Sequence, residues 1–258
     1  MQDLVSIISP SYNCGKYIYD TICSVQGQSY VNWELLVVDD CSNDNTVDTV
    51  NCFQDNRIRL IRNDRNRGAA YSRNIALKEA KGRWIAFLDC DDLWEPAKLE
   101  KQIKFMEDNG YAFSYTEYSE MDADGVLTGV RISGPTKITR SGMFAFCWPG
   151  CLTVMYDATK VGLIQIEDIK KNNDYAMWLK VCKKADCYLL PEVLAIYRRG
   201  RMGSISSHGI STMIKWHFKL FREAEKMGLI SSLWHVGVNL VCGLYKKIKY
   251  VSREGKVS

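Results

Sequence analysis

Short apolar runs and helix-forming stretches follow one another in turn along the first third of the chain. The apolar runs, which predict buried strands, are residues 4–8, 35–38, 58–61 and 84–88. The stretches between them, residues 17–26, 46–53 and 71–80, predict helices. Strands and helices that alternate in this way predict an α/β fold with a doubly wound, mostly parallel sheet. We expect Pro10 to end the first strand, because proline has no N–H to donate to a neighbouring strand.

The pattern becomes less regular after Pro96. The segments that keep a clear pattern are the predicted helices 98–109 and 174–184 and the predicted strands 188–190 and 193–197. Segment 120–150 is rich in Gly, Ser, Thr and Pro, and its pattern predicts no regular element. Residues 210–250 have a helical pattern. We therefore expect flanking helices and a C-terminal helical tail to follow the parallel sheet.

Charge and cysteine content narrow the class of protein. The chain has 258 residues, a net charge of +4 and ten cysteines. Residues 211–258 hold nine Lys and Arg but three acidic residues, so the tail is basic and the remainder is almost neutral. The cysteines form no C-x-x-C pair and have no histidine at zinc-site spacing, which argues against structural zinc and suits a reducing compartment. The chain opens with a strand pattern and no basic leader, so no signal peptide is expected.

Two acidic clusters close two of the predicted strands. Asp39 and Asp40 follow the strand 35–38, and Asp89, Asp91 and Asp92 follow the strand 84–88. In open parallel sheets, ligands bind beyond the carboxyl ends of the strands. Carboxylates gathered there repel one another unless a cation arrives with the ligand, and their hard oxygens suit Mg²⁺ or Mn²⁺ bound with a diphosphate. The alternative, that these aspartates only form turns or cap helices, is left open for Asp39 and is weaker for the cluster ending at Asp92.

Four motifs, in this order and spacing, resemble those of the family 2 glycosyltransferases, which have the GT-A fold. They are Pro10 to Asn13, Val37 to Thr46, Asn66 to Gly68 with Arg73 and Asn74, and Phe87 to Trp94. The resemblance is strong over roughly the first hundred residues and weak over the rest. Four linked motifs are more specific than a lone acid-x-acid motif, so we use the family as a guide to the site.

The resemblance implies a nucleotide-sugar site at these strand ends. Tyr12 and Asp40 would contact the base, usually uracil, and Asp39 would support the strand end or the ribose. The alternative for Tyr12 is a half-buried loop aromatic. The residues implied to bind the nucleotide sugar are Pro10, Tyr12, Asn13, Asp39, Asp40, Gly68, Arg73, Asp89 and Asp91.

The same resemblance implies a metal cofactor, Mn²⁺ or Mg²⁺. Asp89 and Asp91 would form the acid-x-acid motif, and Asp91 or Asp92 would touch the metal. Arg73 would lie near the donor pocket. The alternative for Arg73 is a solvated position on a helix face, because helix arginines usually keep their charged ends in water.

Transfer with inversion also needs a group that removes the proton of the acceptor hydroxyl. In the family that this chain resembles, that group is usually an acidic residue before a helix and a tryptophan, and the segment from Asn172 to Lys180 fits. Where the family commonly has Glu-Asp, this chain has Asn173 and Asp174, which points to Asp174 as the catalytic base. The alternative is that Asp174 only caps the helix.

A second departure from the family lies after the last predicted strand. The family often has a histidine there, near the metal, whereas this chain has Arg198, Arg199 and Arg201. These arginines, with Ser204 and Ser206, are candidates to neutralise a diphosphate, or they form a solvated basic loop. The Gln-x-x-Arg-Trp motif of processive synthases is absent, so transfer of a single sugar is expected.

The tail has a membrane-related pattern. Residues 228–245 contain no charged residue, and Lys246, Lys247 and Lys249 follow them. Polar residues within the stretch make it a poor membrane-spanning segment. An apolar helix beside lysines predicts an interfacial helix on an anionic membrane surface, which would control location rather than chemistry. The alternative is a helix packed on the protein's own core.

Together, the residues and the resemblance imply an inverting, metal-dependent glycosyltransferase. It would move one hexose from a nucleotide sugar, expected to be UDP-linked, to a lipid-linked glycan in O-antigen or capsule biosynthesis. Residues 1–95 would form the nucleotide-sugar-binding half, residues 96–205 the acceptor-binding half of the same domain, and residues 206–258 the basic tail. The expected location is cytoplasmic, peripheral on the inner face of the plasma membrane, with no nucleic-acid partner.

Three other classes are alternatives to this one, of which a nucleotidyltransferase would release pyrophosphate rather than a nucleoside diphosphate. An NAD(P)-dependent oxidoreductase lacks support, because no G-x-G-x-x-G follows the first strand. A non-catalytic nucleotide-sugar-binding module is the third alternative, and the intact acidic cluster argues against it.

Overall fold

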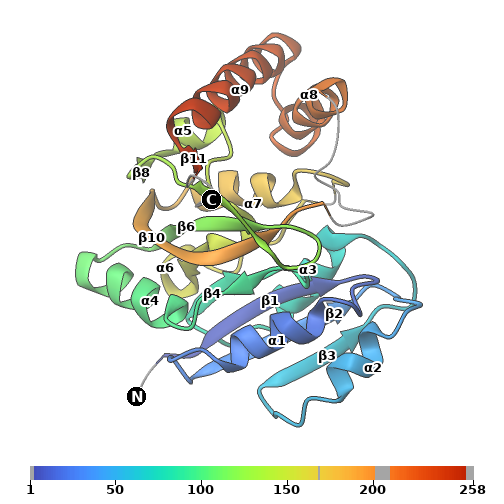
Figure 1. The fold of residues 1–258 in the computed structure, drawn as a ribbon. Helices are drawn as coiled ribbons and strands as arrows, with labels where there is room; N and C mark the ends of the chain where they lie inside the picture. The colour runs from blue at the N-terminus through green and yellow to red at the C-terminus, as the bar shows by residue number, and fades with distance from the viewer. Residues whose placement is uncertain (1–2, 168, 201–209, 254–258) are drawn as a thin grey trace.

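The computed structural model describes residues 3–167, 169–200 and 210–253 (Figure 1). Strands and helices alternate in its first part: β1 (Val5–Ser11), α1 (Ile18–Gln26), β2 (Trp33–Asp39), α2 (Thr46–Asn51), β3 (Ile58–Arg62), α3 (Ala69–Glu79) and β4 (Trp84–Phe87). The middle part contains β5 (Leu93–Trp94), α4 (Lys98–Asn109), β6 (Phe113–Met121), β7 (Leu127–Ile132), β8 (Lys137–Ile138), α5 (Arg140–Ala145) and the 3₁₀ turn Cys151–Thr153. The last part contains β9 (Met155–Asp157), α6 (Ala158–Val161), α7 (Asn173–Val181), β10 (Cys187–Arg198), α8 (Ile210–Lys219), the π turn Leu220–Ala224, α9 (Leu229–Lys249) and β11 (Val251–Arg253).

These strands belong to one sheet. β3, β2, β1 and β4 lie side by side in parallel, which confirms the predicted α/β fold with a mostly parallel sheet. Beyond β4 the sheet is mixed, because β9 pairs antiparallel with both β4 and β6, while β10 runs parallel to β6. The chain passes from β1 to β2 and β3 on one side and returns to β4 on the other. In such sheets a ligand binds where the strand order reverses, which here is between the carboxyl ends of β1 and β4.

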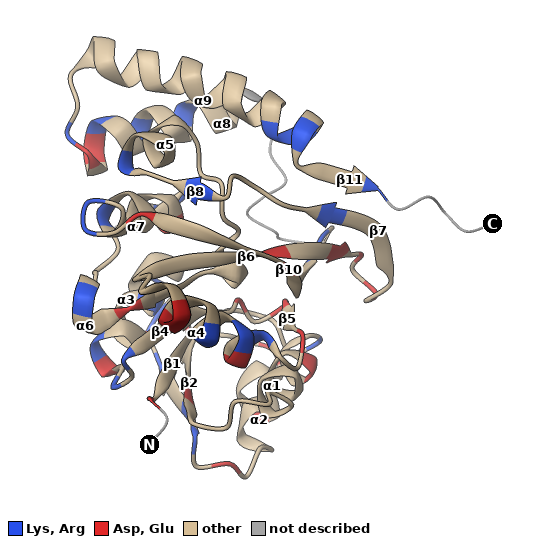
Figure 2. Ribbon diagram, turned by 90° about the vertical axis from the view of Figure 1, so that its left-hand side faces the viewer, with Lys and Arg blue, Asp and Glu red and all other residues tan. Residues whose placement is uncertain are grey.

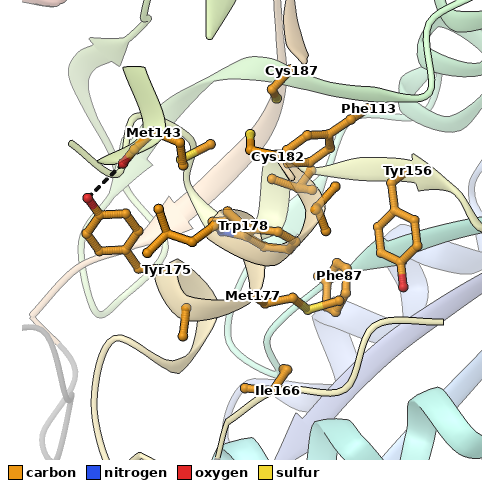
Figure 3. Close-up of a cluster of buried hydrophobic side chains, with 14 of the residues drawn as sticks. Phe87, Phe113, Met143, Tyr156, Ile166, Tyr175, Met177, Trp178, Cys182 and Cys187 are labelled. Carbon is orange, nitrogen blue, oxygen red and sulfur yellow. Dashed lines mark hydrogen bonds between the residues drawn. The ribbon is translucent and has the colours of Figure 1, made fainter. Parts of the chain in front are cut away.

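Both faces of the parallel strands are covered by helices. Successive side chains point to opposite faces, so Ile8 packs with α3 and α7 while Ile7 packs with α1 and α4. Burial on both faces explains why these strands are continuous apolar runs. On the α7 face, Trp178 packs against Phe87 and Phe113, with ring centroids 5.0 Å and 5.9 Å away (Figure 3). This packing fixes α7 relative to the carboxyl end of β4.

The structure corrects three expectations about the elements. β1 continues through Pro10 instead of ending there, because β4 pairs with β1 only as far as Ile8 and the missing N–H breaks no bond with β4. The two late strands are one, β10, which is irregular between Leu190 and Val193. Segment 120–150 contains the end of β6 together with β7, β8 and α5.

The helical tail is interrupted and packs on the rest of the protein through one face. Lys226 has a positive φ of 54°, which ends the first helical stretch before α9 begins. Asn239 Nδ2 donates to Tyr175 Oη of α7 at 3.1 Å, and Lys246 Nζ donates to the carbonyl of Trp148 at 2.6 Å. β11 then pairs with β7 at the sheet edge. Among the residues described, no helix is long and apolar enough to cross a membrane.

The division of the chain by ligand, into residues 1–95, 96–205 and 206–258, stays a prediction. The sheet itself runs from the first of these segments into the second and, through β11, takes in residues of the third.

Candidate active site

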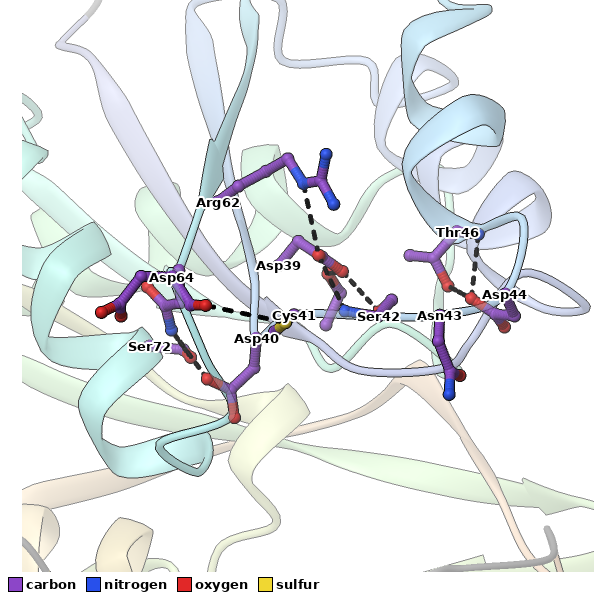
Figure 4. A network of polar contacts seen from close by, with 12 residues as sticks. Asp39, Asp40, Cys41, Ser42, Asn43, Asp44, Thr46, Arg62, Asp64 and Ser72 are labelled. Atoms are coloured by element: carbon purple, nitrogen blue, oxygen red, sulfur yellow. Dashed lines mark hydrogen bonds and ion pairs between the residues drawn. The ribbon is translucent and has the colours of Figure 1, made fainter.

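The predicted site residues gather at the carboxyl ends of β1, β2 and β4. Asp40 is almost fully buried, and its carboxylate bonds to the segment between β3 and α3 (Figure 4). It accepts hydrogen bonds from Asn63 Nδ2 at 2.7 Å, Arg67 N at 2.9 Å and Gly68 N at 2.7 Å. Gly68 has a φ of 88°, a left-handed conformation that favours glycine. Asp40 and Gly68 therefore act on the shape of this loop, and their contact with a nucleotide stays a prediction.

Asp39 is fully buried and supports the end of β2. It accepts hydrogen bonds from Ser42 N at 3.0 Å and Ser11 Oγ at 3.4 Å, and Arg62 Nε lies 3.8 Å from its carboxylate. This arrangement agrees with the supporting role that the sequence implied. The bond from the N–H of Ser42, three residues later, also shows that Asp39 stabilises the turn after β2, as the turn-forming alternative predicts.

Tyr12 and Asn13 lie just beyond Pro10 at the end of β1. Tyr12 is 43% exposed, which is compatible both with a ring that a base can reach and with a half-buried loop aromatic. Asn13 ties this loop to the one after β2, because its N–H donates to Ser42 Oγ at 2.9 Å and its Oδ1 accepts from Asn43 N at 3.0 Å. The two loops thus form one unit beside the point where the strand order reverses. Stacking of Tyr12 on a base stays a prediction.

Arg73 is the residue that joins the two sides of the site. It projects from α3 and is 6% exposed, so the alternative of a solvated helix position is wrong. Its Nη2 donates to Asp89 Oδ1 at 2.5 Å, and its Nη1 donates to Asn173 Oδ1 at 2.7 Å. A buried guanidinium is stable only when it is paired, which both contacts provide. Arg73 therefore links the acidic cluster after β4 to the first turn of α7.

Asp174, the predicted base, lies in that first turn and is half-buried. Burial raises the pKa of its carboxyl above the usual range, the charge of Arg73 opposes the rise, and the charge of Asp89 adds to it. Asn172 occupies the N-cap position and makes no side-chain cap bond, while the carboxyl of Asp174 accepts backbone hydrogen bonds from the first turn itself. The roles of Asp174 as a base and as a helix cap therefore both stay predictions. A carboxylate with a raised pKa near a donor site is suited to accept a proton.

The three aspartates after β4 differ in their surroundings. Asp89 is 35% exposed and Asp91 is half-buried, whereas Asp92 is 2% exposed. Asp92 accepts a hydrogen bond from the N–H of Arg198 at 2.8 Å, which ties the acidic cluster to the end of β10. Burial, followed by the charges of Asp91 and Asp89, raises the pKa of Asp92 well above its usual range. Asp92 is thus engaged inside the protein, and Asp89 and Asp91 are the more accessible pair.

This pair fits a divalent cation that also binds a substrate phosphate. Among the described residues, no three His, Cys, Asp or Glu side chains converge as a metal-ligand group. Mg²⁺, however, is usually held by one or two carboxylates together with phosphate oxygens and water. Asp89 and Asp91 lie near enough to Asp92 that their charges add to the rise in its pKa, which burial chiefly causes. Binding of Mn²⁺ or Mg²⁺ stays a prediction.

The arginines after β10 have partners within the protein. Arg198 Nε donates to the carbonyl of Asp91 at 2.9 Å, and Arg199 Nη1 pairs with Glu120 at 3.0 Å. Their described contacts therefore fix the end of β10. Arg201, Ser204 and Ser206 lie outside the described residues.

Sequence reasoning missed one member of the site and one of its neighbours. Asn173 was passed over in favour of its acidic neighbour, yet it is a direct partner of Arg73. Cys151, in the 3₁₀ turn before β9, is a neighbour of the site rather than a shown member: burial raises the pKa of its thiol well above the usual value, and the charge of Arg73 opposes the rise. The position of Asn173 beside Asp174 was an available signal, whereas nothing in the pattern around Cys151 pointed to the site.

The parallel sheet thus has accessible carboxylates at a strand end, and Arg73 joins them to the first turn of α7, which contains Asp174. The chain belongs to glycosyl transferase family 2, whose family model matches residues 6–142. The chain is therefore a glycosyltransferase, and the oxidoreductase alternative is not favoured.

Relatives and solved structures agree with this assignment. The putative teichuronic acid biosynthesis glycosyltransferase TuaG of Bacillus subtilis is 42% identical over 234 residues, which cover 90% of this chain and 92% of TuaG. The UDP-Glc:alpha-D-GlcNAc-diphosphoundecaprenol beta-1,3-glucosyltransferase WfaP of Escherichia coli is 42% identical over 83% of this chain and 84% of its own. The crystal structure of S. aureus TarS with UDP-GlcNAc superposes with a TM-score of 0.70 at 19% identity, covering 93% of this chain and 72% of that chain. The last comparison confirms the predicted GT-A fold.

Proposed function

We propose that this chain transfers a single hexose from a UDP-sugar to a lipid-linked glycan, with inversion, during assembly of a bacterial surface polysaccharide. The observation that carries the proposal is the Arg73 bridge, which joins Asp89 on the donor side to Asn173 beside Asp174. The names of two Escherichia coli relatives, which include UDP-Glc and a diphosphoundecaprenol acceptor, support the donor and acceptor classes. A lipid-linked acceptor also supports a peripheral location at the inner face of the plasma membrane.

In the proposed mechanism, Asp174 accepts the proton of the attacking hydroxyl. Its pKa is raised by burial, which makes the carboxylate a better proton acceptor than an exposed aspartate. Arg73 holds the first turn of α7 through Asn173, so it keeps Asp174 at a fixed place relative to the strand end that carries Asp89. Fixing reacting groups in this way lowers the entropic cost of reaching the transition state.

Asp89 and Asp91 are the residues that would hold Mn²⁺ or Mg²⁺. A cation there would take up charge on the leaving diphosphate. Asp92 would keep its bond to the N–H of Arg198 and hold the cluster in shape. The finer expectation that Asp92 is itself a metal ligand is thus less favoured by its burial than the same role for Asp91.

The test is a panel of nucleotide sugars incubated with a GlcNAc-diphospholipid acceptor, with and without Mn²⁺, Mg²⁺ and chelator. We expect release of UDP that depends on metal and acceptor, and a product with the anomeric configuration inverted. Asp91→Asn should lower activity by at least about tenfold and weaken metal binding, since it removes one of two charged ligands. Asp92→Asn is the comparison variant, because it keeps an acceptor oxygen for the N–H of Arg198. If Asp92 only holds the cluster in shape, this variant should keep its metal binding.

Separate outcomes would contradict separate parts of the proposal. Full activity in excess chelator would contradict the metal requirement. Preference for a GDP-sugar would contradict the UDP-sugar donor, and retention of the anomeric configuration would contradict inversion. Binding of UDP-sugar without any transfer would favour a non-catalytic module.

A further inference from the structure

Helix α9 has its more apolar side facing outward. Its buried residues include Ser232 and Asn239, and Lys246 is also turned inward to the carbonyl of Trp148. The exposed large apolar residues of the helix are Leu229, Ile230, Leu233, Trp234, Val241, Leu244, Tyr245 and Ile248. A helix that packs on a core normally shows the opposite distribution. The outward side of α9 therefore has the composition of a surface that is covered by something apolar.

The exposed residues form one continuous stripe. Ile230, Trp234, Val241 and Ile248 recur at spacings that place them on one side of a helix, and they are 85%, 70%, 67% and 83% exposed. α9 is the outermost element at its end of the molecule in both ribbon views (Figures 1 and 2). Scattered single apolar residues on a surface are ordinary, but a stripe that runs along a whole helix marks an interaction site.

Positive charge lies at both ends of this stripe, and α9 contains no acidic residue. Lys226 precedes the helix, and Lys247 and Lys249 end it, as the blue end of α9 in Figure 2 shows. The nearby acidic residues already have partners, because Glu223 lies 3.9 Å from Lys219 and Glu225 lies 2.8 Å from Lys183. A binding partner of this stripe is therefore expected to have an apolar interior and a negatively charged surface.

We propose that the outward face of α9, defined by Ile230, Trp234, Val241 and Ile248, lies flat in the surface of an anionic lipid bilayer. The apolar side chains enter the boundary between headgroups and acyl chains, and the lysines contact anionic headgroups. The helix does not span, since no described helix is long and apolar enough. A second copy of the chain fits less well, because lysines would repel one another in either orientation. An antiparallel pair of α9 helices places Lys226 beside Lys247 and Lys249, and a parallel pair places each lysine beside its own copy.

This orientation has a consequence for the acceptor, and this step alone rests on the proposed function. The inner face of α9 contacts α7 through Asn239 and Tyr175, and Tyr175 is next to Asp174. Tyr175 Oη also donates to the carbonyl of Met143 at 2.7 Å, so the start of α7 is held against the segment that α9 covers. Docking of α9 would thus bring α7, whose first turn contains the proposed base, to a place directly beneath the helix that lies on the bilayer, where a lipid-linked acceptor resides.

The test uses the full chain and vesicles without acceptor or nucleotide sugar, so that failure of the proposed transfer reaction does not affect it. Binding is measured by co-sedimentation with phosphatidylcholine vesicles, with and without phosphatidylglycerol, at low and high salt. We expect binding to the anionic vesicles that weakens as salt rises. Brominated acyl chains should quench Trp234, and Trp234→Phe should remove that quenching, which distinguishes it from the partly exposed Trp216. The remaining tryptophans are buried in the protein: Trp33, Trp84, Trp94, Trp148 and Trp178.

Two variants and a control separate the contributions. Ile230→Ser with Trp234→Ser should lower binding by at least about tenfold, since burying even one large apolar side chain is worth that factor. Lys247→Gln with Lys249→Gln should remove much of the salt dependence. The control is Val31→Ser with Val126→Ser, which changes two residues of similar exposure, 61% and 63%, away from α9 and should leave binding unchanged.

Three outcomes would overturn the proposal. They are absence of binding to anionic vesicles at low salt, equal loss of binding in the control variant, and a dimer in solution that Ile230→Ser with Trp234→Ser dissociates. The last result would assign the stripe to a second copy.

Discussion

At the scale of single residues, one buried arginine organises the site. Arg73 bonds to Asp89 and Asn173, which are sixteen and one hundred positions away in the chain. These contacts are weak evidence that Arg73 raises the free energy of unfolding, because burying its charge costs desolvation energy that offsets much of the attraction to Asp89. What the pair provides is a fixed relation between the strand end and the helix start. The site therefore depends on Arg73 for geometry.

Asp174→Asn tests the base at this scale. Removing a positioned base typically lowers the rate by about 10²–10⁴-fold, while Asn172, which holds the N-cap position, is unchanged. In the unaltered enzyme, transfer should rise with pH as Asp174 ionises. That rise should lie above the pH range of an ordinary aspartate, near 3.9, because burial raises the pKa of this carboxyl.

The measurements are transfer rate against pH, donor affinity and melting temperature. Asp108→Asn, in an exposed carboxylate of α4, is the control and should change none of them. If Asp174→Asn transfers sugar at a near-normal rate, Asp174 is not the base.

The sequence indicated most of these residues because strand-end carboxylates leave a clear pattern. Asp39, Asp40 and Asp89 each follow a continuous apolar run, and their gathering follows from the parallel order of the strands. Partners could not be read in the same way. The bond from Asp92 to the N–H of Arg198 joins residues over one hundred positions apart, and no local pattern encodes such a contact.

At the scale of elements, α9 is held to the core by polar contacts on its inner face. Lys246 is the most unusual of them, because burial lowers its pKa to about 8 while its Nζ donates to the carbonyl of Trp148. A lysine whose pKa is lower in the folded than in the unfolded chain lowers the free energy of unfolding, because folding then buries a charged ammonium group. This cost is largest below about pH 8 and is relieved as pH rises toward the usual lysine value of about 10.4.

Lys246→Met should therefore change stability in a pH-dependent way. Relative to the variant, the unaltered protein should become more stable between about pH 8 and pH 10, by up to about 1.4 kcal/mol for each pH unit. Urea unfolding of both proteins at several pH values measures this difference. Lys247→Met, in the exposed neighbour, is the matched control. A difference between the two proteins that does not vary with pH would show that Lys246 does not titrate in this range.

Helices and strands were predicted well where the local pattern of apolar and polar residues determines them. They were predicted poorly where pairing with a neighbouring strand determines them. The helix 98–109 was predicted at its observed bounds, and its amphipathic pattern is enough to explain why. The short strands β8 and β11 have two and three residues, and each exists only because a neighbouring strand lies beside it. A pattern read along the chain contains no information about such a neighbour.

At the scale of the whole molecule, the tail is part of the fold as well as a candidate membrane surface. His235 of α9 lies against Phe144 and Phe221, with ring centroids 5.6 Å and 5.2 Å away. Tyr250, between α9 and β11, lies against Trp148 at 5.8 Å. The alternatives that the sequence left open, membrane contact and core packing, therefore apply to opposite sides of one helix.

Ending the chain after Met227 should destabilise the protein, contrary to the expectation that the tail affects location alone. The truncation exposes several large apolar side chains, each worth about 1.5–3 kcal/mol, in a fold whose total stability is of order 5–15 kcal/mol. We expect a melting temperature lower by at least about 5 °C, or insoluble protein. Ending the chain after Arg253 instead should have no effect. An unchanged, cooperative thermal transition after the first truncation would show that α9 is a detachable segment.

The pairing of β11 with β7 also sets an order of events during synthesis. β7 leaves the ribosome well before Val251 does, so the edge of β7 that β11 covers stays open until residues 251–253 have emerged. The parallel strands β1 to β4 emerge earlier and can pair with one another by then. α9 and β11 are made one directly after the other, so the apolar stripe of α9 emerges only when the rest of the fold is ready to receive its inner face. Among the described elements, α9, whose outer face we assign to the membrane, is thus made after the strands β1 to β10.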